Sequence, residues 1–383
     1  MDGMFNRMIR WLWPVPLLIL LDGCGPQDET KRDVIPRGKA GIIDVIFTYG
    51  SEKEDWVEAV TADFNQRAVK DGAGKVIRVT SLRRDSSDCL DELMAGTTKA
   101  HLTSPASSIF IKRGNAQWRA KTGKDMVPST ESLVRSPIVI AMWKPMAEAI
   151  GWGRQPVGWG EIHGLVTDPQ GWATRGEPAW GKFLFGHTNP QFSSSGLSSL
   201  FAEVYAAAGK PAGLTTEDVQ RPEVARFVGD IEASVLHSGN STGSLAGKMF
   251  ANGWSYLHAA VLYESMLVGI YTQNEPPKVP IVAIYAKEGT FVSDHPVGIV
   301  DAKWGTAEPR DAARKYLDFL LAREQQEKAM EFGFRPARAD VPLVAPLDAA
   351  HGVNPKEPQT TFEVPSVEVM DAMMKLWEQS TKR

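Results

Sequence analysis

Cysteine is scarce in this chain, and the residues that usually build metal or disulfide frameworks form no recognisable pattern. The 383 residues include only two cysteines, Cys24 and Cys89. They make no CxxC pair, no zinc spacing and no disulfide scaffold. The seven histidines form no HxH or HExxH arrangement. The sequence therefore predicts no metal site, no cofactor and no catalytic residue of the metalloenzyme type.

An excess of positive charge is also missing. The chain carries 42 basic and 46 acidic residues, which leaves a formal net charge of -4. Without a basic stripe, the protein is not expected to bind nucleic acid. Hydrophobic residues make up 43% and charged residues 23%. These values are typical of a soluble globular protein, and the length suggests two domains of roughly 150 residues each.

No apolar run is long enough to cross a bilayer as a helix. The longest one near the N-terminus, Trp11 to Leu21, is interrupted by Pro14 and Pro16. It follows two positive residues, Arg7 and Arg10. A short apolar stretch behind a positive segment is typical of an export signal, whereas a spanning helix needs about 20 residues.

The export signal ends in a segment that resembles the bacterial lipoprotein box. In Leu21-Asp22-Gly23-Cys24 a small residue precedes a cysteine, the residue that becomes lipidated in such proteins. A plain signal peptide followed by an incidental cysteine is the alternative. We expect a signal peptide over residues 1–24, lipidation at Cys24 and a polar tether over residues 25–39. The protein would then be exported to the cell envelope and lipid-anchored to a membrane, in the periplasm or on the outer surface.

Apolar runs suited to buried strands alternate with amphipathic segments over the rest of the chain. Ser51 and Glu54 match a capping box, so a helix is expected with Ser51 as its N-cap. Ser104-Pro105 predicts another helix start, and residues 309–332 predict one long helix. Such alternation indicates βαβ units and a parallel sheet. Strands are also expected at 41–47, 76–80, 136–143, 183–186, 259–263, 279–285 and 297–300, and helices at 88–94, 195–208, 224–236, 244–250 and 367–377.

Four segments resemble type II periplasmic solute-binding proteins of the sulfate/molybdate-like group. They occur in the same order as in that family, and the resemblance spans residues 40–343. It is closest to a lipoprotein branch in which some relatives carry a von Willebrand A domain. The segments are Asp44–Lys53, His101–Ser108, Phe185–Pro190 with Ser193–Leu197, and Glu331–Pro336 (EFGFRP).

The resemblance implies an α/β fold of two Rossmann-like lobes with a discontinuous chain and a hinge. Lobe one would comprise residues 40–133 plus 286–383, and lobe two residues 134–285. The extended runs 136–143 and 279–285 would cross between the lobes and form the hinge.

Three hydroxyl-rich loops fall at the expected strand-to-helix junctions. In open α/β sheets, ligands bind at the carboxyl ends of strands beside helix N-termini, where free N–H groups converge. Each serine could instead serve only as a helix cap. Trp143 and Trp159 could stack on a ligand or simply fill the core. The candidate ligand-binding residues are Tyr49, Gly50, Ser51, Ser107, Ser108, Thr188, Asn189, Ser193 and Ser195, with Tyr263 and Glu264 closing the far side.

The sequence leaves the ligand open as a small polar solute or anion. Glu52, Glu54 and Asp55 crowd the first helix start and oppose a compact oxyanion. We expect a monomeric, non-enzymatic substrate-binding component of an ABC transporter that works with an ABC permease. The alternative is a ligand-sensing or assembly lipoprotein without a transporter, partnered by a von Willebrand A-domain protein. A remote alternative is a serine hydrolase using Ser241 of the G-x-S-x-G match at 239–243, although helical periodicity precedes that motif instead of a strand.

Overall fold

The central strands of two β-sheets come from apolar segments such as residues 136–143 and 259–263, which are buried on both faces. The computed structural model describes residues 41–236, 239, 241–272 and 275–381. The expected signal peptide, tether and Cys24 lie outside the described residues. The strands are β1 (Ile42–Gly50), β2 (Val76–Arg84), β3 (Leu102–Ser104), β4 (Glu131–Ser132), β5 (Val134–Trp143), β6 (Phe185–Gly186), β7 (Ala259–Tyr263), β8 (Ile281–Ile284), β9 (Val292–Ser293), β10 (Pro296–Ile299) and β11 (Arg335–Pro336).

The first sheet has the strand order β2-β1-β3-β10-β4 within the described residues. β1 runs parallel to both β2 and β3, whereas β10 is antiparallel to β3 and β4. The second sheet is built around β5, in the order β11-β5-β7-β6, with β8 and β9 also paired to β5. β5 is antiparallel to all of its partners, and β6 runs parallel to β7. The predicted parallel pairing is confirmed for β1, β2 and β3.

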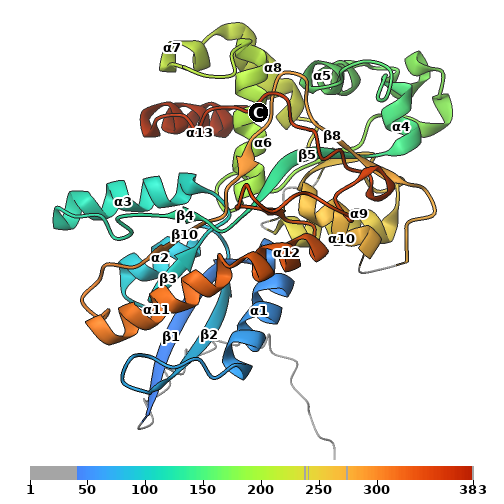
Figure 1. The fold of residues 1–383 in the computed structure, drawn as a ribbon. Coiled ribbons are helices and arrows are strands. Elements are labelled where there is room, and N and C mark those ends of the chain that lie inside the picture. The colour runs from blue at the N-terminus through green and yellow to red at the C-terminus, as the bar shows by residue number, and fades with distance from the viewer. Residues whose placement is uncertain (1–40, 237–238, 240, 273–274, 382–383) are drawn as a thin grey trace, which may run out of the picture. The chain divides into compact units, whose positions relative to one another are not determined.

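Helices cover both sheets. α1 packs on β2 and α11 on β1, whereas α6, α9 and α10 pack on β7 (Figure 1). No helix in the described ranges is long and apolar enough to cross a membrane. The helices are α1 (Glu54–Gln66), α2 (Asp88–Ala95), α3 (Ser108–Thr122), α4 (Lys144–Ala149), α5 (Trp159–Thr167), α6 (Ser194–Ala208), α7 (Thr216–Val219), α8 (Pro222–Glu232), α9 (Thr242–Asn252), α10 (Glu264–Thr272), α11 (Ala307–Leu320), α12 (Arg323–Glu331) and α13 (Val367–Thr381), with the 3-10 turns η1 (Ser51–Lys53), η2 (Gly171–Arg175), η3 (Pro178–Trp180) and η4 (Ala349–His351).

The chain passes between the two sheets three times, which makes both lobes discontinuous. It leaves the first sheet between β4 and β5, comes back between β9 and β10, and enters the second sheet again at β11. The predicted crossover segments 136–143 and 279–285 both lie inside the second sheet, where Ile140 of β5 pairs with Ile284 of β8. The architecture is the expected α/β fold of two lobes, and the return passage lies after the segment expected from the sequence.

Two expected helix starts are wrong. Ser51 begins the 3-10 turn η1, and its side chain caps no helix. Glu54, which would complete the capping box, is 2.9 Å from Arg83 and pairs with it instead. Ser104 is still a strand residue, paired in register with Tyr49. The cap of α3 is Ser107, whose hydroxyl accepts a hydrogen bond from the Ile109 N–H at 3.3 Å.

The single long helix expected at 309–332 is two helices, α11 and α12. The amide of Gln326 donates to the carbonyl oxygens of Leu320 and Leu133, at 3.1 and 2.9 Å. This side chain satisfies a carbonyl group at the end of α11, and Ala322 is extended before α12. The break therefore follows from a long-range side-chain contact, which amphipathic periodicity cannot reveal.

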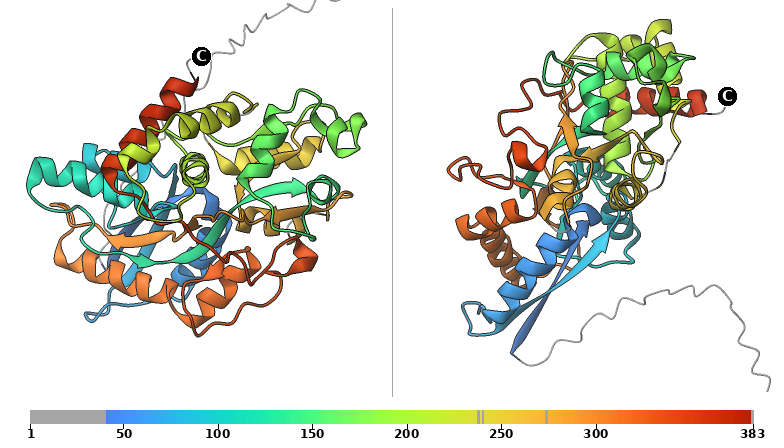
Figure 2. Two further views of the ribbon diagram at one scale, coloured as in Figure 1. Left: turned by 90° about the horizontal axis from the view of Figure 1, so that it is seen from above. Right: turned by 90° about the vertical axis from the view of Figure 1, so that its right-hand side faces the viewer.

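The C-terminal helix α13 packs against α6, α7 and α8, although its residues were assigned to lobe one from the sequence (Figure 2). The Trp377 indole N–H donates to Glu232 Oε2 of α8 at 3.0 Å. Met370, Met373 and Trp377 belong to the same buried cluster as the core of the second sheet. By its contacts, α13 belongs with the elements of lobe two.

Candidate functional site

Two adjoining cavities lie where the first lobe meets the second. The main cavity has a volume of about 270 Å³, and the small cavity, of about 10 Å³, has room for one water molecule. Both are lined by Ser51 and Glu52, and we call them together the cleft. The main cavity is also lined by Lys53–Trp56, Gly243, Ala246, Gly247, Phe250, Ser265, Met266, Gly269, Ile270, Phe332 and Phe334, and the small cavity by Asp85, Ser86, Phe192–Ser194, Thr242 and Tyr263.

The small cavity is formed by strand ends and helix starts from both lobes. From lobe one come η1, directly after β1, and the loop that leads from β2 to α2. From lobe two come the starts of α6 and α9 and the last residue of β7. Helix N-termini present unpaired N–H groups and a partial positive charge, so this arrangement suits hydrogen-bonding groups of a small ligand.

Four buried hydroxyl groups, Thr188, Ser193, Ser195 and Thr242, form a hydroxyl cluster in lobe two. Thr188 Oγ1 lies 2.7 Å from both Ser193 Oγ and Ser195 Oγ. Ser195 Oγ lies 2.6 Å from Thr242 Oγ1, which joins the starts of α6 and α9. Ser193 and Thr242 also line the small cavity. The hydroxyl cluster therefore fixes Ser193 and Thr242, two of the lobe-two residues that line the small cavity.

A buried charged group forms the lobe-one side of the cleft. Glu52 Oε1 lies 2.5 Å from the Lys53 ammonium and 3.1 Å from His295 Nδ1. Burial alone would raise the pKa of Glu52, but the Lys53 charge and the His295 hydrogen bond outweigh it and lower the pKa to about 2. Burial lowers the pKa of His295, so this ring is neutral and donates its Nδ1 proton to the carboxylate.

His295 lies between β9 and β10, on the return passage between the sheets. Its backbone adopts a φ of 38°, a left-handed conformation that is unusual for a residue other than glycine. Its ring centre lies 5.8 Å from that of Tyr263 and 5.3 Å from that of Phe334. His295 thus connects the carboxylate of Glu52 in lobe one with the end of β7 in lobe two.

Of the predicted ligand-binding residues, Ser51, Ser193 and Tyr263 line the small cavity. Thr188 and Ser195 lie next to it in the hydroxyl cluster. The phenol of Tyr263 is buried, which raises its pKa, and the negative charge of Glu52 raises it further. The structure thus brings five of the predicted ligand-binding residues together at or beside the small cavity.

Two other predicted residues are held elsewhere. The Tyr49 side chain is 1% exposed and lies in the core of lobe one with Phe47. Burial raises its pKa well above the usual range. Glu264 is fully buried and pairs with both Nε and Nη2 of Arg335, at 2.7 and 2.6 Å, and it also accepts a hydrogen bond from Tyr285. Neither side chain lines the cleft.

The remaining predicted positions have local backbone roles. The Glu52 carboxylate lies directly against Gly50, so any side chain at Gly50 would displace it. Ser107 caps α3, and the Ser108 N–H donates to Asp294 Oδ1 at 3.0 Å. Asn189 Oδ1 accepts from the Gln191 N–H at 2.8 Å.

The two tryptophans that could have stacked on a ligand belong to the core of lobe two. Trp143 and Trp159 are 4% and 2% exposed. The indole N–H of Trp143 donates to the Leu257 carbonyl oxygen at 2.8 Å. Both rings pack within the protein interior and do not line the cleft.

Sequence reasoning missed Glu52, Asp85, Ser86, Ser194 and Thr242 as cleft residues. Asp85 and Ser86 follow β2 directly, but the strand was expected to end at Thr80, and it continues to Arg84. With the strand ending at Arg84, the polar residues that follow form a strand-to-helix junction of the same kind as the other loops, and this junction was the available signal. Burial raises the pKa of Asp85, and the nearby Glu52 charge raises it as well, although Arg83 opposes both effects.

The G-x-S-x-G match does not form a nucleophile elbow. Ser241 is the N-cap of α9, and its hydroxyl accepts from the Ser244 N–H at 3.4 Å. Among the described residues, the regular element before it is helix α8, whereas an elbow requires a strand directly before the serine. This geometry gives the hydroxyl a capping role.

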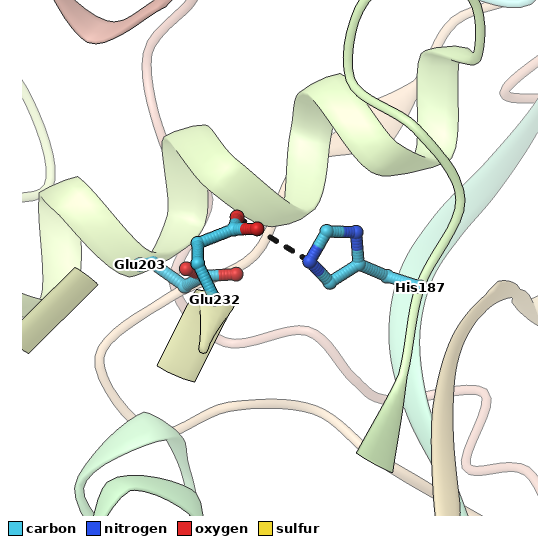
Figure 3. Close-up of side chains that lie close together, drawn as sticks. All are labelled: His187, Glu203 and Glu232. Carbon is cyan, nitrogen blue, oxygen red and sulfur yellow. Dashed lines mark ion pairs between the residues drawn. The ribbon is translucent and has the colours of Figure 1, made fainter. Parts of the chain in front are cut away.

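A second polar cluster adjoins Thr188 of the hydroxyl cluster, and none of its three residues lines the cleft. His187, Glu203 and Glu232 are all buried, and their side chains point toward one another (Figure 3). Burial lowers the pKa of His187, but the Glu232 carboxylate outweighs this effect and raises the pKa to about 9. Burial raises the pKa of Glu203 well above its usual value, and the charge of Glu232 adds to this.

Comparisons with known proteins give a consistent result. The sequence model of a family described as bacterial extracellular solute-binding protein matches residues 45–335. No curated protein matches the sequence. Among solved structures, a periplasmic thiamin binding protein is similar with a TM-score of 0.62 and 16% identity, covering 91% of this chain and 100% of that chain.

Two further solved structures share the fold at low identity. The ferric binding protein from Campylobacter jejuni has a TM-score of 0.59 and 12% identity, covering 88% of this chain and 99% of that chain. The sulfate-binding protein SubI from Mycobacterium tuberculosis H37Rv has a TM-score of 0.52 and 17% identity, covering 78% and 88%. Their names describe different ligands, so the likeness extends to the fold alone.

Proposed function

Because the chain belongs to the family of bacterial extracellular solute-binding proteins, we propose that it captures a small polar solute in the cleft and delivers it to an ABC permease. The observation that carries this proposal is the convergence of η1, the β2–α2 loop, the α6 and α9 starts and the end of β7 on the small cavity of the cleft. The small cavity has room for one water molecule, so the lobes would open to admit a solute and close again around it. Closure would remove water from these groups and strengthen each hydrogen bond.

The groups around the small cavity favour hydrogen bonding over charge pairing. Ser51, Ser86, Ser193, Thr242 and Tyr263 supply hydroxyl groups that can donate or accept. Phe192 lines the same cavity, and its ring is 43% exposed, so it could cover the apolar face of a bound solute. A solute with several hydroxyl or amino groups matches this combination.

The charges at the cleft disfavour a compact anion. Glu52 is ionised, but Lys53 already neutralises it at 2.5 Å. Asp85 adds a carboxylate to the small cavity, and Glu54 and Asp55 line the main cavity. A sulfate-like ion would therefore face carboxylates without a free cation of its own among the cleft-lining residues. We propose a neutral or cationic polar solute.

Native mass spectrometry of freshly purified protein, followed by thermal-shift measurements, tests the proposal. Sugars, polyols, amino acids and polyamines would be compared with sulfate and phosphate. A neutral or cationic solute should raise the melting temperature in a concentration-dependent way. A shift with sulfate or phosphate alone would refute the proposed charge preference, and no binding by any solute in the panel would count against the cleft.

Matched substitutions then test the site once a solute from the panel binds. Thr242→Ala and Asp85→Asn should each weaken its binding by roughly tenfold, about 1.4 kcal/mol. Ser107→Ala is the control, because Ser107 caps α3 and does not line the cleft. Equal affinity of all three variants and the wild type would place the solute elsewhere.

We also propose how the two lobes divide the chain and how the protein is held at the membrane. We expect residues 40–133 and the 294–331 region to move as lobe one, and residues 134–285 with β11 and α13 to move as lobe two. Lipidation at Cys24 would hold the exported, monomeric protein at the membrane, close to a permease. The apolar and strand-rich passages around β5 and β9 would serve as the hinge.

A further inference from the structure

The buried cluster of His187, Glu203 and Glu232 brings one imidazole and two carboxylates together inside lobe two. One candidate ligand atom from each residue lies within 4.8 Å of the others. The exposed fractions are 1% for His187, 0% for Glu203 and 7% for Glu232. His187 follows β6, Glu203 lies on α6 and Glu232 ends α8, so three separate elements meet here (Figure 3).

Each of the three side chains uses one polar atom in an outer hydrogen bond, and its second polar atom faces the centre of the cluster. His187 Nδ1 donates to the Thr188 carbonyl oxygen at 2.8 Å, because that oxygen can only accept. Glu203 Oε1 accepts from Ser199 Oγ at 3.0 Å, and Glu232 Oε2 accepts from the Trp377 indole at 3.0 Å. The atoms without a hydrogen-bond partner are His187 Nε2, Glu203 Oε2 and Glu232 Oε1.

Those three atoms offer one nitrogen and two carboxylate oxygens to a cation between them. Without a bound ion, His187 Nε2 lies 3.3 Å from Glu232 Oε1, and the protonated imidazole pairs with that carboxylate (Figure 3). In the described part of the chain no lysine or arginine pairs with either glutamate, so the single charge of the imidazole compensates only one of the two carboxylates. Buried charge without a counter-charge is strongly unfavourable. Either protons or one divalent ion must compensate it.

We propose that His187, Glu203 and Glu232 bind a divalent transition-metal ion of the zinc class that ties lobe two together. Tetrahedral ligands at zinc distances of about 2.1 Å lie roughly 3.4 Å apart, close to the separation of His187 Nε2 and Glu232 Oε1. An imidazole nitrogen favours zinc, iron or nickel over magnesium or calcium. One water molecule would complete a tetrahedral set.

The outer hydrogen bonds match those that usually orient metal ligands. A metal-bound histidine typically donates its second N–H to a carbonyl or carboxylate, and ligating carboxylates accept further hydrogen bonds. Here the Thr188 carbonyl holds the ring, while Ser199 and Trp377 hold the two glutamates. Thr188 also belongs to the hydroxyl cluster, and Trp377 belongs to α13. The ion would thus stabilise both the starts of α6 and α9 and the docking of α13.

Metal titration of the EDTA-treated full-length protein tests this site independently of any cleft ligand. We expect one Zn²⁺ per chain by elemental analysis, a higher melting temperature with Zn²⁺ and no comparable effect of excess Mg²⁺. Glu203→Gln and His187→Gln should lose at least about a hundredfold in Zn²⁺ affinity, and Trp377→Phe, which removes only the outer N–H, about tenfold. His163→Gln is the matched control, because His163 forms a partly exposed pair with Asp230 instead.

The alternative of shared protons gives a different result. In that case the EDTA-treated protein would bind no Zn²⁺, and Glu203→Gln would fold with equal or greater stability at neutral pH. Either finding would overturn the metal site, as would Zn²⁺ binding that persists in both Glu203→Gln and His187→Gln. If His187→Gln fails to fold, Co²⁺ titration of the wild type against Glu203→Gln decides the question, since visible absorption reports nitrogen and carboxylate ligation directly.

Discussion

The ionised state of Glu52 depends on two neighbours and not on solvent. Its carboxylate is buried, and Lys53 and His295 supply the compensating charge and proton. The pKa falls from its ordinary 4.5 to about 2. When folding lowers the pKa of a group, that group stabilises the fold at pH values above its pKa in the unfolded chain. This contribution is lost as the pH falls toward the pKa of the group in the folded protein.

Glu52→Gln should therefore change the pH dependence of stability in the acid range. The wild type is expected to lose a few kcal/mol between pH 4.5 and pH 2 through this group, whereas the variant loses less over that window. At pH 7 the variant should be less stable by about 3 kcal/mol, because Lys53 is left buried without its partner. Urea unfolding at pH 7, 4.5 and 3 measures both effects. Parallel pH profiles of the two proteins would contradict the assignment.

At the scale of an element, the start of α3 shows how a neighbouring serine takes the capping role. Ser107 has an extended backbone and caps the helix through its hydroxyl, whereas Ser104 remains in β3. The distinction depends on how far the strand pairing with β1 extends, which the local sequence does not show.

Ser107→Ala should destabilise the protein by about 1 kcal/mol, as expected for loss of an N-cap hydroxyl. Ser108→Ala is the matched control, because the contact of Ser108 with Asp294 is made by its backbone N–H. Its stability should stay within about 0.5 kcal/mol of the wild type. Chemical denaturation of both variants provides the comparison, and equal losses in the two would exclude a specific cap at Ser107.

At the scale of the molecule, the ion pair of Glu264 and Arg335 joins α10 to β11. Glu264 is fully buried, and Arg335 also donates to the carbonyl oxygens of Glu357 and Asn354. Arg335→Ala should cost roughly 3–5 kcal/mol, because the Glu264 carboxylate is left buried without its counter-charge. Arg338→Ala removes an exposed pair with Asp340 and should cost less than about 1 kcal/mol. A small loss in both variants, measured by thermal unfolding, would contradict a stabilising role of the Glu264–Arg335 pair.

The attachment of the whole protein to the membrane is tested by Cys24→Ser. Lipidation at this cysteine predicts that the wild type fractionates with membranes and that the variant becomes soluble. Cell fractionation with immunoblotting measures the difference, and Cys89→Ser is the control because the Cys89 thiol is fully buried, which raises its pKa to about 12. Membrane association that survives in Cys24→Ser would exclude the lipid anchor.

Much of the secondary structure could be read from local sequence, because hydrophobic periodicity and caps act over a few residues. The strand Ala259–Tyr263 and helices Asp88–Ala95 and Ser194–Ala208 agree closely with expectation. The family resemblance also predicted the α/β fold of two lobes. These features depend on patterns that each segment carries by itself.

Only the tertiary structure decided which polar groups meet. Tyr49 and Glu264 looked like ligand-binding residues in sequence, but one is packed in the core and the other is bound by Arg335 from far along the chain. Asp85 and Thr242 join the cleft because separate strands and helices end at the same point. His187, Glu203 and Glu232 have no local motif at all, since three elements bring them together. Spacing along the chain carries no information on contacts between distant segments, and it is burial that determines the charge each group can hold.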